Sequence, residues 1–113
     1  MLTLTAKESA LHYLHQCISA CENCYSMCLR EGNASHMVDC IITDRECADI
    51  CTLTARLVAA DSRIADKMLQ LCIDICHTCE AICRKHDNEH CQECADACHA
   101  CHLACESYLR VTI

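Results

Sequence analysis

Small apolar side chains recur at intervals of three and four residues along most of the chain, and the majority of them are cysteine. Residues three and four apart lie one above the other on the same face of an α-helix. The pattern therefore predicts helices that each carry a stripe of thiols. Asp44 stands in register with the second stripe, where the spacing asks for another thiol. The stripes are Cys17, Cys21, Cys24 and Cys28; Cys40, Cys47 and Cys51; Cys72, Cys76, Cys79 and Cys83; and Cys91, Cys94, Cys98, Cys101 and Cys105.

The four stripes predict four helices in a single domain, residues 1–113. Short connections force neighbouring helices to run antiparallel. The expected fold class is therefore all-α: an antiparallel up-down-up-down four-helix bundle with a cysteine-lined core. Gly32 is expected to end the first helix, and the other three are expected to start at an N-cap. The expected bounds are Leu4 to Gly32, Ser35 to Ala59 or Ala60, Asp61 or Ser62 to His86, and Asp87 or Asn88 to Arg110.

The composition indicates that the thiols form the core in their reduced state. The chain has sixteen cysteines, no Phe and no Trp among its 113 residues, and free cysteine packs as a small hydrophobe. One Gly and no Pro disfavour a turn-rich disulfide scaffold. Intrahelical neighbours have Cβ atoms about 5–6 Å apart, which is too far for a disulfide but suits a shared metal ion.

Charge and the N-terminal sequence narrow the partners and the compartment. The formal net charge is −7, with no run of Lys or Arg, so nucleic acid and anionic membrane are disfavoured as partners. Met1 to Gln16 contains no long apolar run and no small-residue cleavage site, so neither a signal peptide nor a membrane span is expected. We therefore expect a cytoplasmic protein, because thiols stay reduced in the cytosol.

The two ends of the predicted bundle differ in chemistry, which suggests one closed end and one mouth. At the apolar end the cysteine-side faces carry Ala6, Ala10, Tyr13, Leu14, Ala55, Val58, Ala65, Met68, Leu69, Tyr108 and Leu109. At the other end they carry the polar and metal-binding residues Cys28, His36, Met37, Cys40, Cys83, His86, Asp87, His90 and Cys91.

Soft thiolates select Cu(I), zinc or iron–sulfur clusters. Structural zinc uses closed sets of four ligands, and a continuous column of thiols is not expected to divide into such sets. Cu(I) accepts two or three thiolates, which can bridge ions, so multiple Cu(I) ions are the preferred cargo. The alternatives are a zinc buffer or sensor, and an iron–sulfur electron-transfer protein, although the ferredoxin cysteine run is missing. No catalytic constellation is recognised, and no enzyme is expected.

Several residues besides the cysteines are candidate ligands. His36, His86 and His90 are expected at the mouth, as metal-uptake residues or as solvated helix ends. Met37 is a soft ligand there or a packing residue. Asp44 is a ligand, a proton acceptor for nearby thiols, or a polar residue reaching an opening, because burying an unpartnered carboxylate is costly. The remaining histidines are expected at the surface or an interface: His12, His15, His77, His99 and His102.

Across essentially its whole length the chain resembles the bacterial cytosolic copper storage proteins. The resemblance is carried by the four cysteine-lined helices, by Cys-x3-Cys steps such as Cys17/Cys21 and Cys72/Cys76, and by the His-bearing end. It implies a bundle that stores many Cu(I) ions, is loaded through one end and assembles as a homotetramer. This chain departs from the pattern at Asp44, where copper capacity should be lower or an oxygen ligand is supplied.

The sequence gives a weak signal of its own for a homo-oligomer. Ile42 and Leu53 lie opposite the cysteine stripe of the second helix, but Asp49 interrupts the patch between them. Outward apolar residues can mark a partner surface, although scattered ones are common. The expected tetramer therefore rests mainly on the resemblance.

Overall fold

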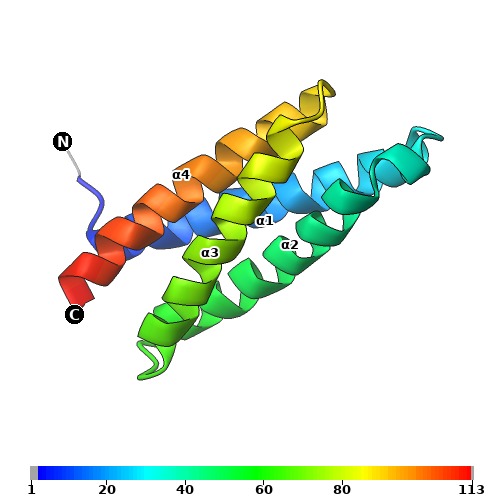
Figure 1. Cartoon of the computed structure of the whole chain (residues 1–113). Coiled ribbons are helices and arrows are strands. Elements are labelled where there is room, and N and C mark those ends of the chain that lie inside the picture. Colours follow the sequence, from blue (N-terminus) through cyan, green and yellow to red (C-terminus); the bar gives the residue numbers. More distant parts are fainter. Residues whose placement is uncertain (1–2, 113) are drawn as a thin grey trace.

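A computed structural model describes residues 3–112. Within that range the chain forms four long helices and one short 3₁₀ helix (Figure 1). These elements are α1 (Ala6–Arg30), η1 (Ala34–His36), α2 (Val38–Ala59), α3 (Ala65–Arg84) and α4 (Glu89–Thr112).

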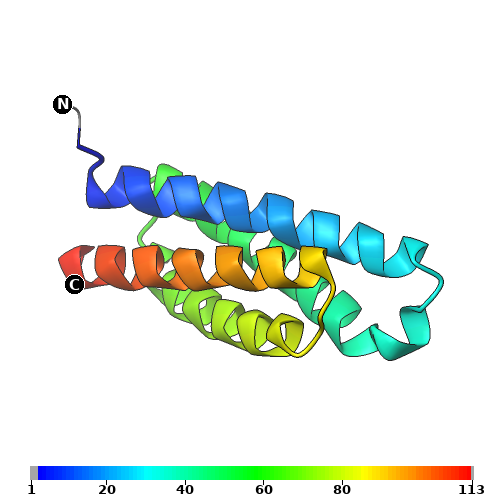
Figure 2. The ribbon, with the colours of Figure 1, turned by 90° about the horizontal axis from the view of Figure 1, so that it is seen from above.

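The helices form an antiparallel bundle in which each packs against two others, in the cyclic order α1, α2, α3, α4. Both termini and the α2–α3 connection lie at one end, and the other two connections lie at the opposite end (Figures 1 and 2). The predicted up-down-up-down topology is confirmed. None of the helices within residues 3–112 combines the length and the apolar character that a membrane crossing needs.

The first helix begins and ends much as its sequence predicts. The Thr5 hydroxyl accepts a hydrogen bond from the backbone N–H of Glu8, and the Glu8 carboxylate accepts one from Thr5 N–H, both at 3.1 Å. This capping box satisfies two amide groups that a helix start leaves free. Gly32 has a φ of 69°, the left-handed conformation favoured after a helix end, and the C-cap itself is Glu31.

The predicted N-caps of the second and third helices are wrong. Ser35 lies within η1, and Met37 occupies the N-cap of α2. At the next connection Ile64 is the N-cap of α3, and the Ser62 hydroxyl accepts from Ile64 N–H at 3.3 Å in the turn before the helix. Asp61 adopts a φ of 52° in that turn, outside the extended region typical of an N-cap.

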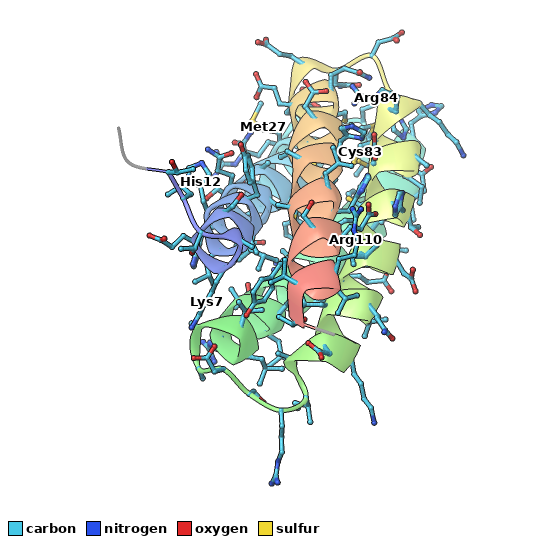
Figure 3. All side chains as sticks on the ribbon, turned by 90° about the vertical axis from the view of Figure 1, so that its left-hand side faces the viewer. Lys7, His12, Met27, Cys83, Arg84 and Arg110 are labelled. Carbon is cyan, nitrogen blue, oxygen red and sulfur yellow. The ribbon has the colours of Figure 1, made fainter. Side chains whose placement is uncertain are left out.

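The core is built almost entirely from the thiol stripes. All sixteen cysteines are free and buried, and polar side-chain tips project outward, with His12 and Arg84 on opposite sides of the bundle (Figure 3). The end near the termini is closed by apolar side chains, as predicted. Its fully or largely buried members are Ala10, Leu14, Ala55, Val58, Ala65 and Leu69.

Candidate metal centre

Sulfur atoms from all four helices meet along the axis of the bundle. Contacts run both along a helix, as for Cys17 and Cys21 at 4.0 Å, and between helices, as for Cys51 and Cys72 at 3.7 Å. Thiolate–metal bonds of about 2.3 Å place two sulfurs on one ion about 3.7–4.6 Å apart, from tetrahedral to linear coordination. The thiol column is therefore spaced for soft metal ions before any metal arrives.

The shortest sulfur–sulfur contacts divide the column into two groups of thiols, although Cys79 of the first group also lies within 4.8 Å of Cys21, Cys94 and Cys98 of the second. The outer cluster, at the end with the α1–α2 and α3–α4 connections, consists of Cys24, Cys28, Cys40, Cys79, Cys83 and Cys91. The inner cluster consists of Cys17, Cys21, Cys47, Cys51, Cys72, Cys76, Cys94, Cys98, Cys101 and Cys105.

Sets of four thiols are present, contrary to the prediction that the column does not divide in this way. In each set the four sulfur atoms lie within 4.8 Å of one another. The sulfur atoms of each set come from three or four different helices. The spacing of cysteines along a single helix does not reveal which sulfurs of different helices will meet. Three sets share no member: Cys17, Cys51, Cys76 and Cys101; Cys21, Cys79, Cys94 and Cys98; and Cys24, Cys28, Cys40 and Cys91.

Asp44 joins the two clusters. Its side chain is 0% exposed, and its Oδ1 accepts from Cys83 and Cys94 at 3.4 Å each and from Cys79 at 3.5 Å. Oδ2 lies 3.7 Å from Sγ of Cys40. The carboxyl group therefore faces the core, as its register predicts, and touches thiols of both clusters.

Burial, and next the negative charge that Cys94 carries when it ionises, raise the pKa of Asp44 from its ordinary 3.8 to about 10. At neutral pH the metal-free core therefore holds Asp44 as a neutral acid. This form avoids the cost of a buried, unpaired carboxylate. Three roles were predicted for Asp44. Because its side chain is fully buried, the geometry disfavours the role of a polar residue that reaches an opening.

His90 connects the outer cluster to the surface. Its ring is 7% exposed, with Nδ1 at 3.3 Å from Sγ of Cys24 and 3.6 Å from Sγ of Cys91. Nε2 lies 2.8 Å from Oε1 of Glu31, and the amide of Asn88 donates to the same oxygen at 3.2 Å. Because Nε2–H can donate to Glu31, Nδ1 can offer its lone pair to the thiols or to a metal.

The other predicted mouth residues lie at varied depths. His86 is half-buried, with Nε2 3.2 Å from Oδ1 of Asp39. Met37 is buried against the outer cluster's end of the core. His36 is exposed, and because it belongs to η1 it does not follow the helical phase from which its inward position was predicted.

Two features of the structure were missed in the sequence. Glu31, the partner of His90, was not recognised in the sequence as a site residue, because only its position before Gly32 sets it apart. His102 was expected at the surface or an interface, yet its side chain is only 4% exposed, because glutamates from α3 and α4 cover it. His77 and His99 are exposed as predicted.

The bundle and its thiol column define a helical protein that can hold many soft metal ions in its interior. The sequence profile of the copper storage protein family matches residues 4–110. The chain therefore belongs to the copper storage protein family.

Known proteins of similar sequence and structure agree with this assignment. The uncharacterized cysteine-rich protein YhjQ of Bacillus subtilis (strain 168) is 42% identical over 85 residues, 75% of this chain and 79% of that protein. The Cu(I)-bound copper storage protein BsCsp3 superposes with a TM-score of 0.87 at 41% identity, covering 91% of this chain and 97% of that structure. Apo copper storage protein 3 from Bacillus subtilis gives a TM-score of 0.83 at 40% identity, covering 90% and 97%. The copper storage protein Ccsp from Streptomyces lividans, which is cytosolic and was loaded with 10 copper equivalents, gives a TM-score of 0.90 at 33% identity, covering 93% and 84%.

We predict that Asp44→Asn makes stability of the metal-free protein less dependent on pH. Between pH 4 and the folded pKa of about 10, Asp44 is ionised in the unfolded chain but protonated in the folded one. The folded state then binds one more proton, so stability falls as pH rises. Relative to the variant, the free energy of unfolding of the wild type should fall by on the order of 1 kcal/mol for each pH unit. Anaerobic denaturant unfolding of both proteins from pH 4 to 8 measures this difference.

The matched control is Asp74→Asn, the same change on the exposed face of α3. Its stability should follow the wild type at every pH. Parallel stability curves for Asp44→Asn and the wild type would show that Asp44 is ionised in the metal-free core.

Proposed function

We propose that this protein stores Cu(I) ions in its thiol core. The observation that carries the proposal is the column of sixteen buried, reduced cysteines, in which sulfurs from different helices approach to between 3.2 and 4.0 Å. Thiolates are ligands that Cu(I) prefers, and they can bridge adjacent ions. The copper-bound relatives support the same cargo. The role is storage without catalysis, and the relative described as cytosolic supports a cytoplasmic location.

Charge favours Cu(I) over zinc in this core. One Cu(I) that replaces one thiol proton leaves the interior neutral, whereas one Zn(II) in a set of four thiolates leaves a charge of −2. Buried net charge is costly without compensating partners. A zinc buffer is nevertheless a second candidate, because sets of four thiols whose sulfur atoms lie within 4.8 Å of one another do exist.

The proposed ligands are the sixteen thiols, with Asp44 as an oxygen ligand between the two clusters once it has lost its proton. We place the mouth at the outer cluster, where His90 touches Cys24 and Cys91 and His86 is near the surface. His36 and Met37 flank that end. The opposite end is closed by the apolar residues that include Leu14, Val58 and Leu69.

Copper must displace protons as it enters. Burial raises the pKa of the Cys28 thiol to about 12, and burial also raises that of Cys91. Both thiols in the outer cluster are therefore protonated in the metal-free protein at neutral pH. Metal ligation requires thiolate, so each Cu(I) bound should release about one proton.

Anaerobic titration of the reduced protein with Cu(I) tests the proposal. We expect saturation near sixteen ions per chain, about one per thiolate, with metal analysis of the desalted protein as the measurement. Zn(II) at the thiols should saturate near four, one ion per four thiolates. Replacing Cys47 with Ser should lower the copper capacity by about one ion while leaving the bundle folded. Copper that saturates at four ions or fewer would contradict storage and favour the zinc buffer.

The mouth is tested by replacing His36, His86 and His90 together with Ala. Because these residues guide uptake and add few ligands, the rate of loading or release should change several-fold while capacity stays within about two ions. Stopped-flow mixing with a chromophoric Cu(I) complex measures the rate. The control replaces His12 and His15 on the exposed face of α1; kinetics equal to the wild type in both variants would remove the mouth from this end.

We also propose that the chain forms a homotetramer, as the family resemblance implies. The exposed apolar side chains Ile42 and Leu53 on α2 offer a contact surface that closed symmetry could use. They lie on the face of α2 opposite the thiols, so assembly should leave each core complete.

Replacing both Ile42 and Leu53 with Glu should shift the light-scattering mass toward the monomer, 12.6 kDa, without changing copper capacity. Like charges brought into a self-contact oppose association. A wild type that is monomeric across micromolar concentrations would contradict the tetramer. A variant that stays tetrameric would place the contact on another face.

A further inference from the structure

A second group of metal-ligating side chains lies outside the thiol core, across the seam between α3 and α4. It contains His77 and Glu80 from α3, and His99, His102 and Glu106 from α4. Copper storage in the thiol column makes no use of these residues. Most of the side-chain nitrogen and oxygen atoms in this group already contact another member of the group.

Glu80 faces two imidazole rings at once. Its Oε1 lies 2.9 Å from Nε2 of His102, and its Oε2 lies 2.9 Å from Nδ1 of His99. The two rings are nearly perpendicular, at 82°, and their centroids are 5.0 Å apart. Two imidazoles on one tetrahedral ion have centroids about 5 Å apart, given zinc–nitrogen bonds of about 2.0–2.1 Å. Both rings and the carboxylate therefore already stand at ligand spacing.

His102 is held in the orientation that ligation through Nε2 requires. Its other nitrogen, Nδ1, lies 3.2 Å from Oε1 of Glu106. A metal-bound histidine usually donates its second ring N–H to a carboxylate or carbonyl, which fixes both the tautomer and the ring. Glu106 thus plays the part of that second partner, while the burial of His102 prevents its ring from turning away.

His77 supports this arrangement from the outside. Its Nε2 lies 3.1 Å from Oε1 of Glu106, and its ring stacks on His102 with centroids 3.7 Å apart and planes 23° apart. A metal ion lies close to the plane of each ring that binds it. Two nearly parallel stacked rings cannot both meet that condition, so His77 positions Glu106 and His102 and does not share their ion.

We propose that Glu80, His99 and His102 form a site for one borderline divalent ion of the zinc class, with water completing the coordination. Two imidazoles and one carboxylate are a ligand set that zinc uses in proteins. Imidazole and carboxylate suit Zn(II) better than Cu(I), whereas the thiols have the opposite preference. The ion joins α3 to α4 on the outside of the bundle and leaves the thiol core free for copper.

Cobalt(II) is the probe, because its spectrum reports the ligand type. With the thiols occupied by Cu(I), the protein should bind one Co(II) per chain, with ligand-field bands but no intense sulfur-to-cobalt absorption. His99→Ala should abolish this binding. Glu106→Gln should weaken it by about 10–100-fold, as for the loss of a carboxylate behind a metal-bound histidine. His12→Ala, an exposed histidine on α1, is the control and should bind as the wild type does.

Two results would overturn the site: no Co(II) retained by the wild type, or equal retention by His99→Ala. The test does not depend on copper storage. If Cu(I) fails to load, Co(II) is added to the metal-free protein, where thiolate-bound cobalt absorbs strongly and the His/Glu site does not. The site is then supported if one equivalent of weakly absorbing Co(II) is lost in His99→Ala but still bound by Cys47→Ser. The site is contradicted if neither variant binds this equivalent.

Discussion

The structure depends on the spacing of three and four residues between cysteines on one helix. This spacing aligns the sulfurs into stripes, and the antiparallel bundle brings four stripes face to face. The same side chains are therefore the hydrophobic core and the candidate metal ligands. Thiols are small, so the helices can approach until sulfurs on different helices, such as Cys40 and Cys83, lie 3.2 Å apart. A core of Leu or Phe could not bring ligand atoms together in this way.

Asp44 is the one carboxyl group in this column, and its state depends on what surrounds it. Burial keeps it protonated in the metal-free core, with a pKa of about 10. A nearby cation lowers the pKa of a carboxyl group, so ions held beside Cys83 and Cys94 favour its ionised form. Asp44 touches both clusters. When metal ions bind beside it, it therefore changes from a neutral acid that contacts thiols into an anion at the point where the two clusters meet.

The fold and the thiol core follow from the sequence because cysteine periodicity determines which face of each helix points inward. The inward position of Asp44 and the apolar closed end, with Leu14 and Leu69, follow from the same phase. Helix starts were less predictable: Ser35 is a residue type preferred at N-caps, yet it lies within η1, and Met37 takes the N-cap of α2. The burial of His102 was unpredictable for another reason. It depends on Glu80 across the seam, and no local pattern reveals which side chains will meet there.

Electrostatics explains how a small bundle can accept so many ions. Each Cu(I) that replaces a thiol proton leaves the charge of the protein unchanged, so the net negative charge of the chain persists as the core fills. The negative field that attracts cations to the surface is therefore not weakened by the ions already bound. Divalent ions at sets of four thiolates add buried negative charge with every site, and each further site becomes harder to fill. The number of thiols, and not accumulated charge, then sets the limit on Cu(I).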